Sequence, residues 1–515
     1  MPNAVAAIAV DAGDRVQKWT FVEVATAARR LATILHNAGL CPGDRVLLLM
    51  PRVPYWQVAM TACMQIGLIP IPCVTQITEK DIVYRANQSG ARGVITSAGH
   101  TEKFATIGTS LVIKASLGGG KGWVDLEEAL AAAGECQHVA EMTADTPALM
   151  YFTSGSSGFP KAVVHAARGV YVRSWQPWRQ LRVKPGETIW ATSDTGWTRF
   201  GSCLLFGAWM HGATAFMYEG PLEPAARLAL LNRFEINYFC AVATELRRLL
   251  SASGQWRFPK LSVTFSAGEA VTAELLRRWR EFSGAPVRVG YGQTETPTST
   301  LTDEDVLPAN GLIGRPMAGN HIAIINEEGC EVETGKDGEI AFAADDPGLM
   351  LGYWRKGQID SGKRITANGK SWYVTGDHGY CDEIGNFHFI GRGDDIISSA
   401  GYRIGPIEVE NVLLQHPAVI DCAVAASPDP ARGEVVKAFV ILTPGVTPSE
   451  QLAAALQDHV KKLTAPYKCP RCIEFVRHLP RTGSGKLARR ELREAEFAKL
   501  SKHSSGTKSP ASRGS

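Results

Sequence analysis

The sequence has no long apolar run and no marked excess of charge of either sign. No window approaches the ~20 uncharged apolar residues that a membrane-spanning helix needs, so no membrane span is predicted. The 515 residues include 54 basic and 51 acidic side chains, which leave a formal net charge of +3. Such a balance gives no whole-chain field that would select nucleic acid. Any anion that the protein binds must therefore be held by a local cluster of donors.

Cysteine is present without any repeating spacing. The number of cysteines, 11, is odd, which favours free thiols in a reducing compartment over a disulfide framework. The close pair Cys469 and Cys472 has no second pair or histidines at matching spacing, so it predicts two ordinary thiols rather than a metal site. The opening MPNAVAAIAVDAGDR has no basic residue before its apolar run and no convincing cleavage site. No signal peptide is predicted, and we expect a cytoplasmic protein.

Short apolar runs alternate with helix-period segments over the first 300 residues. The segments 21–40, 244–253 and 273–282 place arginines on one face and leucine or alanine on the other, as in helices that cover a sheet. The alternation predicts parallel sheets, whose ligands bind at the carboxyl ends of the strands. We therefore expect the glycine-rich loop after the run at 148–155 to lie at such an edge. The runs expected to be buried strands are 45–50, 93–97, 148–155, 187–193, 236–243 and 262–268.

The pattern changes near Gly311 to short strands separated by turn residues, which predicts an antiparallel subdomain at about 311–393. Alternating helices and strands return after Arg392-Gly-Asp-Asp. We place a domain boundary near Asp394, which divides a domain at 1–393 from a small C-terminal α/β domain at 394–500. The polar tail at 501–515 is predicted to be disordered.

Two glycine-rich loops end in a lysine: TSGSSGFPK, from Thr153 to Lys161, and RTGSGK, which closes at Lys486. Neither fits the P-loop pattern Gly-x-x-x-x-Gly-Lys-Ser/Thr. Lys161 follows Phe159 and Pro160, and Lys486 has proline where the first glycine should stand. Taken alone, the first loop could equally be a chance run of glycine and serine.

Six motifs, in order, resemble those of the adenylate-forming superfamily of acyl-CoA synthetases, luciferases and peptide-synthetase adenylation domains. Three further segments, PRVPYW, SPDPARGEVVKAFV and HVKKLTAPYK, are similar to the medium-chain acyl-CoA synthetases in particular. The resemblance covers nearly the whole chain and implies an α/β fold: a large domain of two helix-covered mixed sheets with an antiparallel β subdomain, and a small mobile C-terminal domain. The six motifs are TSGSSGFPK, SDTGW, YGQTET, TGDHG, GRGDDIISSAGYRIGPIEVE and RTGSGK.

The resemblance implies an AMP-forming acid–CoA ligase that uses ATP, Mg²⁺ and coenzyme A. A medium-chain or aromatic carboxylate attacks the α-phosphate of ATP to give acyl-AMP and pyrophosphate, and the thiol of coenzyme A then displaces AMP. The first step brings two anions together, so it needs concentrated positive charge and preorganised donors. The partners expected are these small molecules, and the protein is expected to be a monomer or a homodimer.

The motifs imply an ATP site. Glycines let the backbone approach phosphate closely, and hydroxyls add donors. By resemblance, Thr294 contacts the α-phosphate, Glu295 binds Mg²⁺ as a hard carboxylate, and Asp377 accepts both ribose hydroxyls with its paired oxygens. Arg392 and Arg403 match residues that contact ribose and phosphate. The remaining residues implied are Thr153, Ser154, Gly155, Ser156, Ser157, Gly158 and Lys161 for the β- and γ-phosphates, and Gly268, Glu269, Val289, Gly290, Tyr291, Gly292 and Gln293 for the adenine side.

Three positions depart from the pattern of the family. Val289 and Gly290 stand where this branch more often has an acidic residue and a serine, and Cys469 stands where an aromatic ring often stacks on the adenine of coenzyme A. These departures bear on the nucleotide contacts and leave the predicted fold unchanged.

Lys486 resembles the catalytic lysine that bridges the attacking carboxylate and the α-phosphate. A compact charge on a long stem can do so without fixed bidentate geometry. For the thioester step, the matches are Gly401 and Tyr402, where pantetheine would pass. Asp394 matches the hinge about which the small domain would present first Lys486 and then Gly401. Arg432, Lys461 and Gln76 are expected near the nucleotide of coenzyme A, and Trp197, Thr198 and Gly292 are expected to line the acyl pocket.

Two other functions stay open at this point. One is an adenylation domain that loads a carrier protein, although no carrier domain is visible in the sequence. The other is a catalytically impaired adenylate-binding protein, because relatives usually have several dozen more residues before the segment that resembles KWTFVEV. The presence of Lys486, Glu295 and Asp377 favours an active enzyme.

Overall fold

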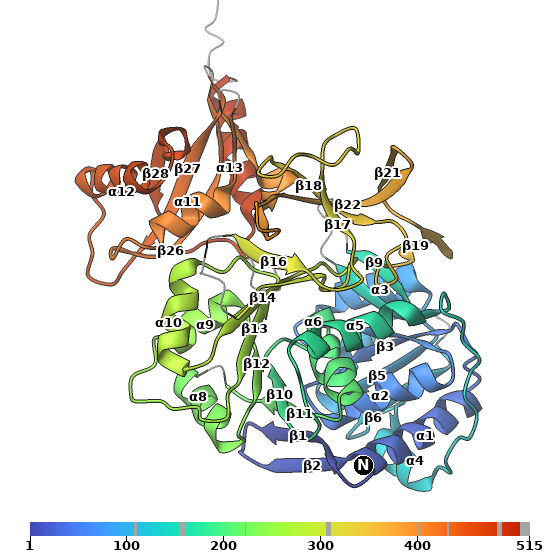
Figure 1. Cartoon of the computed structure of the whole chain (residues 1–515). Helices are drawn as coiled ribbons and strands as arrows, with labels where there is room; N and C mark the ends of the chain where they lie inside the picture. Colours follow the sequence, from blue (N-terminus) through green and yellow to red (C-terminus); the bar gives the residue numbers. More distant parts are fainter. Residues whose placement is uncertain are drawn as a thin grey trace, which may run out of the picture.

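The computed structural model is shown in Figure 1. It describes residues 1–107, 111–153, 160–221, 223–304, 309, 311–399, 402–429, 432–481 and 487–504. Within these ranges, no helix is both long and apolar enough to cross a bilayer.

A 14-stranded mixed sheet forms the centre of the larger part of the molecule. Its middle strands are parallel, which confirms the expectation for the runs near 187–193, 236–243 and 262–268. These strands are almost entirely buried, because helices cover the sheet. They are β11 (Thr214–Glu219), β10 (Thr188–Ala191), β12 (Tyr238–Cys240), β13 (Val263–Ala267) and β14 (Val287–Tyr291), with β1 (Val5–Asp11) and β2 (Val16–Thr20) at one edge.

Helix α10 (Ala273–Ser283) illustrates how local sequence specifies these covering helices. Its N-cap Thr272 accepts a hydrogen bond from the backbone N–H of Leu275, and Gly284 ends the helix with a φ of 75°. Trp279 is fully buried, and its indole N–H donates to Thr264 Oγ1 at 2.8 Å on β13. The other helical elements of this part are α5 (Ala167–Gln180), α6 (Thr198–Gly201), η2 (Ser202–Gly207), α7 (Ala208–Met210), α8 (Pro224–Arg233) and α9 (Ala243–Leu249).

A five-stranded parallel sheet lies beside the large sheet and confirms the strands expected at 45–50 and 93–97. Helix α1 begins with a capping box in which Thr20 and Glu23 exchange hydrogen bonds, and it packs on α2. The strands are β3 (Arg45–Leu49), β4 (Ile69–Pro72), β5 (Gly93–Ser97), β6 (Ile113–Leu117) and β7 (Val124–Asp125), and the helices are α1 (Phe21–Asn37), α2 (Pro54–Gln65), α3 (Glu79–Ser89), η1 (Ala98–Phe104) and α4 (Leu126–Ala132).

The run at 148–155 does not belong to a parallel sheet, so that prediction is wrong. It forms β8 (Pro147–Thr153), which pairs antiparallel with β9 (Lys161–Ala166) in a four-stranded sheet completed by β19 (Gly352–Arg355) and β20 (Gln358–Asp360). A continuous apolar run is buried on both faces in either kind of sheet, so its pattern does not reveal the direction of its neighbour. The glycine-rich loop therefore connects two antiparallel strands.

The antiparallel strands expected at 311–393 are present, and most of them continue the large sheet rather than form a separate one. Strand β15 (Thr300–Leu301) pairs with both β14 and β16 and so joins the two parts. The strands added are β16 (Leu312–Pro316), β17 (Ile322–Ile325), β18 (Gly338–Ala343), β21 (Arg364–Ala367), β22 (Lys370–Cys381) and β23 (Phe387–Arg392).

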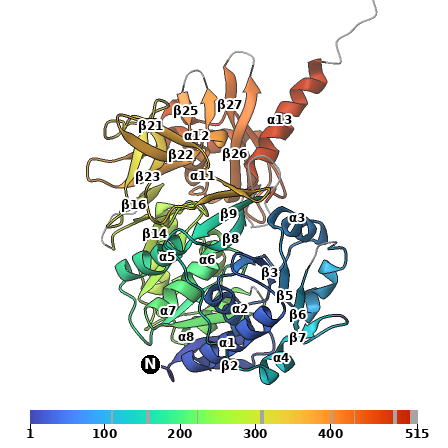
Figure 2. The same cartoon turned by 90° about the vertical axis from the view of Figure 1, so that its right-hand side faces the viewer.

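The C-terminal part has its own sheet and its own hydrophobic core. Figures 1 and 2 show it at one end of the molecule, above β16 and away from the N-terminus. Helix α13 extends to Ser504, beyond the predicted start of the tail, and residues 505–515 lie outside the described residues. The elements are η3 (Gly393–Asp395), β24 (Ile397–Ser399), β25 (Tyr402–Ile404), α11 (Pro406–Leu413), β26 (Val419–Asp429), β27 (Gly433–Leu442), α12 (Glu450–Leu463), η4 (Pro466–Lys468), β28 (Cys472–Phe475) and α13 (Arg489–Ser504).

Candidate active site

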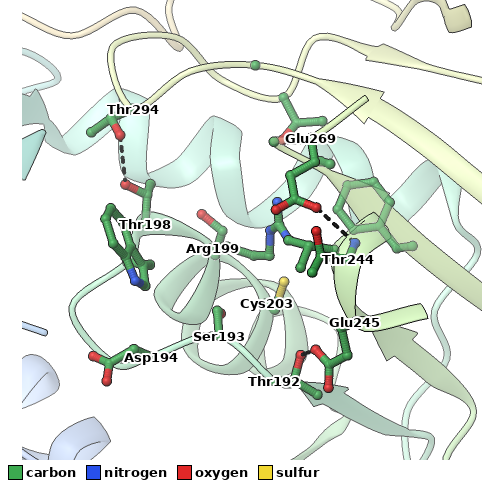
Figure 3. Close-up of a pocket in the computed structure, with 18 of the residues that line it drawn as sticks. Thr192, Ser193, Asp194, Thr198, Arg199, Cys203, Thr244, Glu245, Glu269 and Thr294 are labelled. Carbon is green, nitrogen blue, oxygen red and sulfur yellow. Dashed lines mark hydrogen bonds between the residues drawn. The ribbon is translucent and has the colours of Figure 1, made fainter. Parts of the chain in front are cut away.

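A cavity of about 510 Å³ opens where the parallel strands of the large sheet end (Figure 3). Its walls include Asp194 after β10, Val242 after β12, Gly268 after β13 and Gly292 after β14. Parallel sheets bind ligands at this edge because the residues that follow adjacent strands converge there. The location agrees with the general expectation for the sheet, although the strands that flank the glycine-rich loop, β8 and β9, belong to a different sheet.

The short helix α6 brings the predicted acyl-pocket residues to the predicted α-phosphate contact. Trp197 is its N-cap and Thr198 its first residue, and both line the cavity with Gly292 and Thr294. The hydroxyl of Thr198 lies 3.5 Å from that of Thr294 (Figure 3). The same cavity is lined by Gly268, Glu269 and Gln293 from the predicted adenine side and by Gln76.

Asp377 stands at the centre of a buried polar cluster. Its side chain accepts hydrogen bonds through Oδ2 from the hydroxyl of Tyr291 and from Nε2 of Gln293, both at 2.7 Å. Arg392 Nη1 lies 3.1 Å from Oδ1, opposite Asp377 in the pairing of β22 with β23. Oδ1 has no hydrogen bond within the described part of the chain, although Asp377 is only 4% exposed. A buried carboxylate oxygen with an unused lone pair fits a ribose hydroxyl.

The electrostatics of this cluster keep its donors protonated. Burial and the charge of Asp377 raise the pKa of the Tyr291 hydroxyl well above its ordinary value. Burial by itself would lower the pKa of the Arg392 guanidinium. The neighbouring groups Asp377, Tyr291 and Glu295 outweigh this effect, so the pKa is raised above its ordinary value. Tyr291 is therefore a donor to the carboxylate at neutral pH, and Arg392 stays charged.

Two residues hold the segment of Thr294 and Glu295 in place. Arg173 on α5 donates from Nη2 to the carbonyl of Thr294 at 2.9 Å, and the hydroxyl of Tyr353 on β19 donates to Glu295 Oε1 at 3.0 Å. Arg173 is only 4% exposed, and burial lowers its pKa to about 10. It therefore remains charged near neutral pH. The sequence interpretation missed both residues; an arginine within the apolar face of the helix at 167–180 was the one signal that could have indicated Arg173.

Glu295 is suited to a magnesium ion that is held together with phosphate. No group of three or more His, Cys, Asp or Glu side chains forms a metal cage in the described ranges. Mg²⁺ is ordinarily bound through one or two carboxylates, substrate phosphates and water, so a single glutamate beside a phosphate contact fits it.

Comparisons with known proteins identify the family. The model of the AMP-binding enzyme family matches residues 1–354, and that of the AMP-binding enzyme C-terminal domain matches residues 408–486. The chain belongs to the AMP-binding enzyme family. This membership confirms the superfamily indicated by the six motifs.

Similar proteins cover almost the whole of this AMP-binding enzyme. The mitochondrial acyl-coenzyme A synthetase ACSM3 of Homo sapiens is 37% identical over 93% of the chain and 84% of its own length, and ACSM5 of Homo sapiens is 36% identical over 94% and 85%. The solved anthranilate CoA ligase AuaEII, in complex with anthranoyl-AMP, has a TM-score of 0.87 at 27% identity, with coverage of 97% and 96%. A benzoate CoA ligase from Burkholderia xenovorans has a TM-score of 0.81 at 26% identity, with coverage of 95% and 96%. The predicted fold class, the AMP-forming acid–CoA ligase class and the use of ATP, Mg²⁺ and coenzyme A are thereby confirmed.

The residue that ends the glycine-rich loop of this AMP-binding enzyme lies near Tyr353, which contacts Glu295. Thr153 and Lys161 face each other across β8 and β9, and Lys161 Nζ lies 5.1 Å from the ring centre of Tyr353, which contacts Glu295. The loop residues predicted between them, Ser154, Gly155, Ser156, Ser157 and Gly158, lie outside the described residues, as do Gly401 and Lys486.

The residues predicted to bind coenzyme A are spread over two parts of the enzyme. Gln76 lines the cavity, whereas Tyr402 stacks on Tyr467 in the C-terminal part with ring centres 4.3 Å apart. Lys461 pairs with Asp458 at 3.2 Å. The backbone N–H of Arg432 donates to Asp429, and no hydrogen bond or ion pair joins the four predicted residues within the described ranges. The side chain of Arg403 lies outside the described part of the chain.

Cys469 and Asp394 have identifiable surroundings in the C-terminal part. Cys469 is 5% exposed, and its Sγ lies 3.5 Å from the carbonyl oxygens of Gln457 and Pro470, so its thiol is packed against the protein. The carbonyl of Asp394 accepts a hydrogen bond from Arg493 on α13. The predicted hinge thus contacts the helix that follows the loop of Lys486.

Proposed function

We propose that this acid–CoA ligase activates a medium-chain or aromatic carboxylic acid as acyl-AMP, and that the residues of the six motifs carry out the two half-reactions. The observation that supports the assignment best is the buried Asp377 cluster, in which one carboxylate oxygen forms no hydrogen bond with the residues that the structure describes. Gln293, a member of this cluster, also lines the cavity in which Thr198 meets Thr294. Nucleotide and acid would then meet at Thr294.

The nucleotide is bound from two sides in this proposal. Asp377 accepts the ribose hydroxyls while Tyr291 and Gln293 hold its other oxygen. Arg392 adds positive charge beside them. Adenine lies along the strand end at 289–291, close to Gly268. The absence of a side chain at Gly268 makes room for Arg199, because a Cβ there would lie 2.6 Å from Arg199 Nη2.

The acid lies in the remaining part of the cavity with its carboxylate toward Thr294. Apolar walls are supplied by Trp178, Trp197, Phe265 and Leu249, which would bury a hydrocarbon chain or ring. The likeness to the anthranilate and benzoate CoA ligases supports the aromatic alternative, and the similarity to acyl-coenzyme A synthetases supports the aliphatic one.

The two glycine-rich loops act on opposite sides of the α-phosphate. The first, from Thr153 to Lys161, binds the departing pyrophosphate, and Mg²⁺ at Glu295 neutralises phosphate charge when bound. Lys486 contacts the attacking carboxylate and the α-phosphate, so that it stabilises charge that develops in the transition state. We propose that the small domain then turns about Asp394 to present Gly401 for thioester formation.

The test separates the two half-reactions. Lys486→Ala should abolish acid-dependent ATP–pyrophosphate exchange, and it should leave thioester formation from supplied acyl-AMP largely intact. Lys462→Ala removes an exposed lysine at the end of α12 and serves as the matched control, with both half-reactions expected to match the unmodified enzyme. Equal loss of both half-reactions in Lys486→Ala would contradict the assigned role. Absence of exchange with every acid tested in the unmodified enzyme would favour the impaired scaffold instead.

A further inference from the structure

The cavity contains more positive than negative side chains. Five arginines and three carboxylates line it: Arg52, Arg173, Arg199, Arg227 and Arg248, with Asp194, Glu245 and Glu269. The chain as a whole is nearly neutral, so this excess is local. ATP and the reacting carboxylate, which the proposed function places in this cavity, account for part of the excess. A purely apolar acyl group would not account for the rest, because an unpaired charge beside an apolar ligand loses hydration without compensation.

Three of these arginines are occupied by the protein. Arg52 pairs with Glu219 at 3.1 Å, Arg227 pairs with Glu245, and Arg173 donates to the carbonyl of Thr294. Arg248 is exposed at the surface of α9. Arg199 remains: it is partly buried, and it forms no hydrogen bond or ion pair with any residue that the structure describes.

The carboxylates of the cavity are also engaged. Asp194 accepts hydrogen bonds from the backbone N–H groups of Thr75 and Gly196, at 3.1 and 3.0 Å. Glu245 accepts from the hydroxyl of Thr192 in addition to its ion pair, and Glu269 Oε2 accepts from the backbone N–H of Thr244 at 2.9 Å. Figure 3 shows the side chain of Arg199 reaching from α6 toward the side of the cavity that Glu269 and Thr244 occupy.

Arg199 lies where the acyl side of the proposed site meets the adenine side. It follows Thr198, whose hydroxyl lies 3.5 Å from that of Thr294, and its guanidinium lies against Gly268, where a Cβ would approach Nη2 to 2.6 Å. Cys203 and Phe265 line the same wall. A ligand whose reacting carboxylate is at Thr294 would therefore meet a planar guanidinium donor within the same cavity. Guanidinium groups bind carboxylates by paired hydrogen bonds.

We propose that the acyl substrate has a second carboxylate, which Arg199 binds, so that the enzyme prefers dicarboxylic acids to monocarboxylic acids of equal length. This inference rests on the proposed function, because it assigns a partner to one residue of the same acyl site. Apolar contacts alone would distinguish poorly between a dicarboxylic acid and a monocarboxylic acid of equal length. An ion pair with Arg199 distinguishes them, because a bound monocarboxylate would leave the guanidinium partly desolvated and unpaired.

The test compares matched acids in ATP–pyrophosphate exchange. Linear dicarboxylates and monocarboxylates of about four to eight carbons are measured with the unmodified enzyme, Arg199→Leu and Arg199→Lys. At the preferred length, Arg199→Leu should lower kcat/KM for the dicarboxylate by roughly tenfold to a hundredfold and raise kcat/KM for the matched monocarboxylate. Arg199→Lys should retain part of the preference because it keeps the charge. Arg179→Leu, which removes an exposed arginine from α5, is the control and should leave the ratio of the two values unchanged.

The outcomes separate this inference from the function on which it rests. Exchange with monocarboxylates that exceeds exchange with dicarboxylates at every length would overturn the inference and leave the ligase assignment standing. An equal loss for both kinds of acid in Arg199→Leu, accompanied by a higher KM for ATP, would show that Arg199 serves the nucleotide and would also overturn it. No exchange with any acid would contradict both.

Discussion

Replacing Asp377 by asparagine tests the nucleotide cluster at its centre. The substitution keeps the shape of the side chain, but it removes the charge that Tyr291, Gln293 and Arg392 surround. It also turns one acceptor oxygen into a donor, which faces donors already in place. A hydrogen bond to a charged group contributes about 1.5–3 kcal/mol, and the variant loses at least one ribose contact of this kind. We therefore expect the variant to lose about 2–4 kcal/mol of transition-state stabilisation. This loss corresponds to a decrease in kcat/KM for ATP of roughly 30-fold to 1,000-fold.

The assay is acid-dependent ATP–pyrophosphate exchange at varied ATP, with circular dichroism to verify that the variant is folded. Asp382→Asn is the matched control, because Asp382 is a carboxylate next to the end of the same strand and contacts His388 at 2.9 Å instead of Tyr291 and Gln293. It should leave the KM for ATP unchanged. A folded Asp377→Asn variant with a KM and kcat for ATP within about threefold of the unmodified enzyme would refute the assignment of Asp377 to the ribose.

The remaining predictions concern positioning, acid stability and the thioester step. Arg173→Met removes the donor to the carbonyl of Thr294 and should lower kcat for exchange by about tenfold with little change in KM for the acid; an unchanged kcat would exclude a positioning role. Burial acts against the charge on Glu496, but hydrogen bonds from Lys437, Lys499 and Ser427 outweigh it and lower the pKa of this carboxyl. Because the folded-state pKa is the lower one, the carboxylate stabilises the fold above the ordinary pKa of glutamate, and this contribution disappears as the pH falls through the folded-state pKa. Glu496→Gln should therefore lower the thermal unfolding midpoint near pH 7 and weaken its dependence on pH between about 6 and about 3; an unaltered pH profile would count against this role. Gly401→Leu should block acyl-CoA formation and spare exchange, and normal thioester turnover in that variant would argue against passage of pantetheine at Gly401.

Much of the fold could be predicted because its pattern is local. Thr272, the apolar face with Trp279 and the terminal Gly284 are enough to define α10 from its own residues. The parallel strands from 187 to 268 are recognisable because helices separate them. The prediction that β8 belongs to a parallel sheet was wrong. The direction of its pairing is set by β9, on the far side of a loop, and a continuous apolar run has the same pattern in parallel and antiparallel sheets.

Asp377 and Thr294 could be named from the sequence because they stand within recognisable motifs, and their roles remain predictions. Residues that act through long-range contacts could not be named in this way. Arg173 and Tyr353 contact Thr294 and Glu295 across more than 50 residues of sequence, and Arg199 is distinguished only by the partners of the other arginines in the cavity. Such roles depend on tertiary packing, which has no periodic signature. The cytoplasmic location remains a prediction.

The measurement that tests the central claim most directly is the formation of AMP and of an acyl-CoA product from ATP, Mg²⁺ and coenzyme A across a panel of aliphatic, aromatic and dicarboxylic acids. The product is identified by mass spectrometry, and each reaction is repeated without acid and without coenzyme A. The proposed function predicts AMP release that requires an acid, together with one acyl-CoA per AMP when coenzyme A is present. AMP release that is independent of the acid, or the absence of acyl-CoA with every acid in the panel, would contradict it.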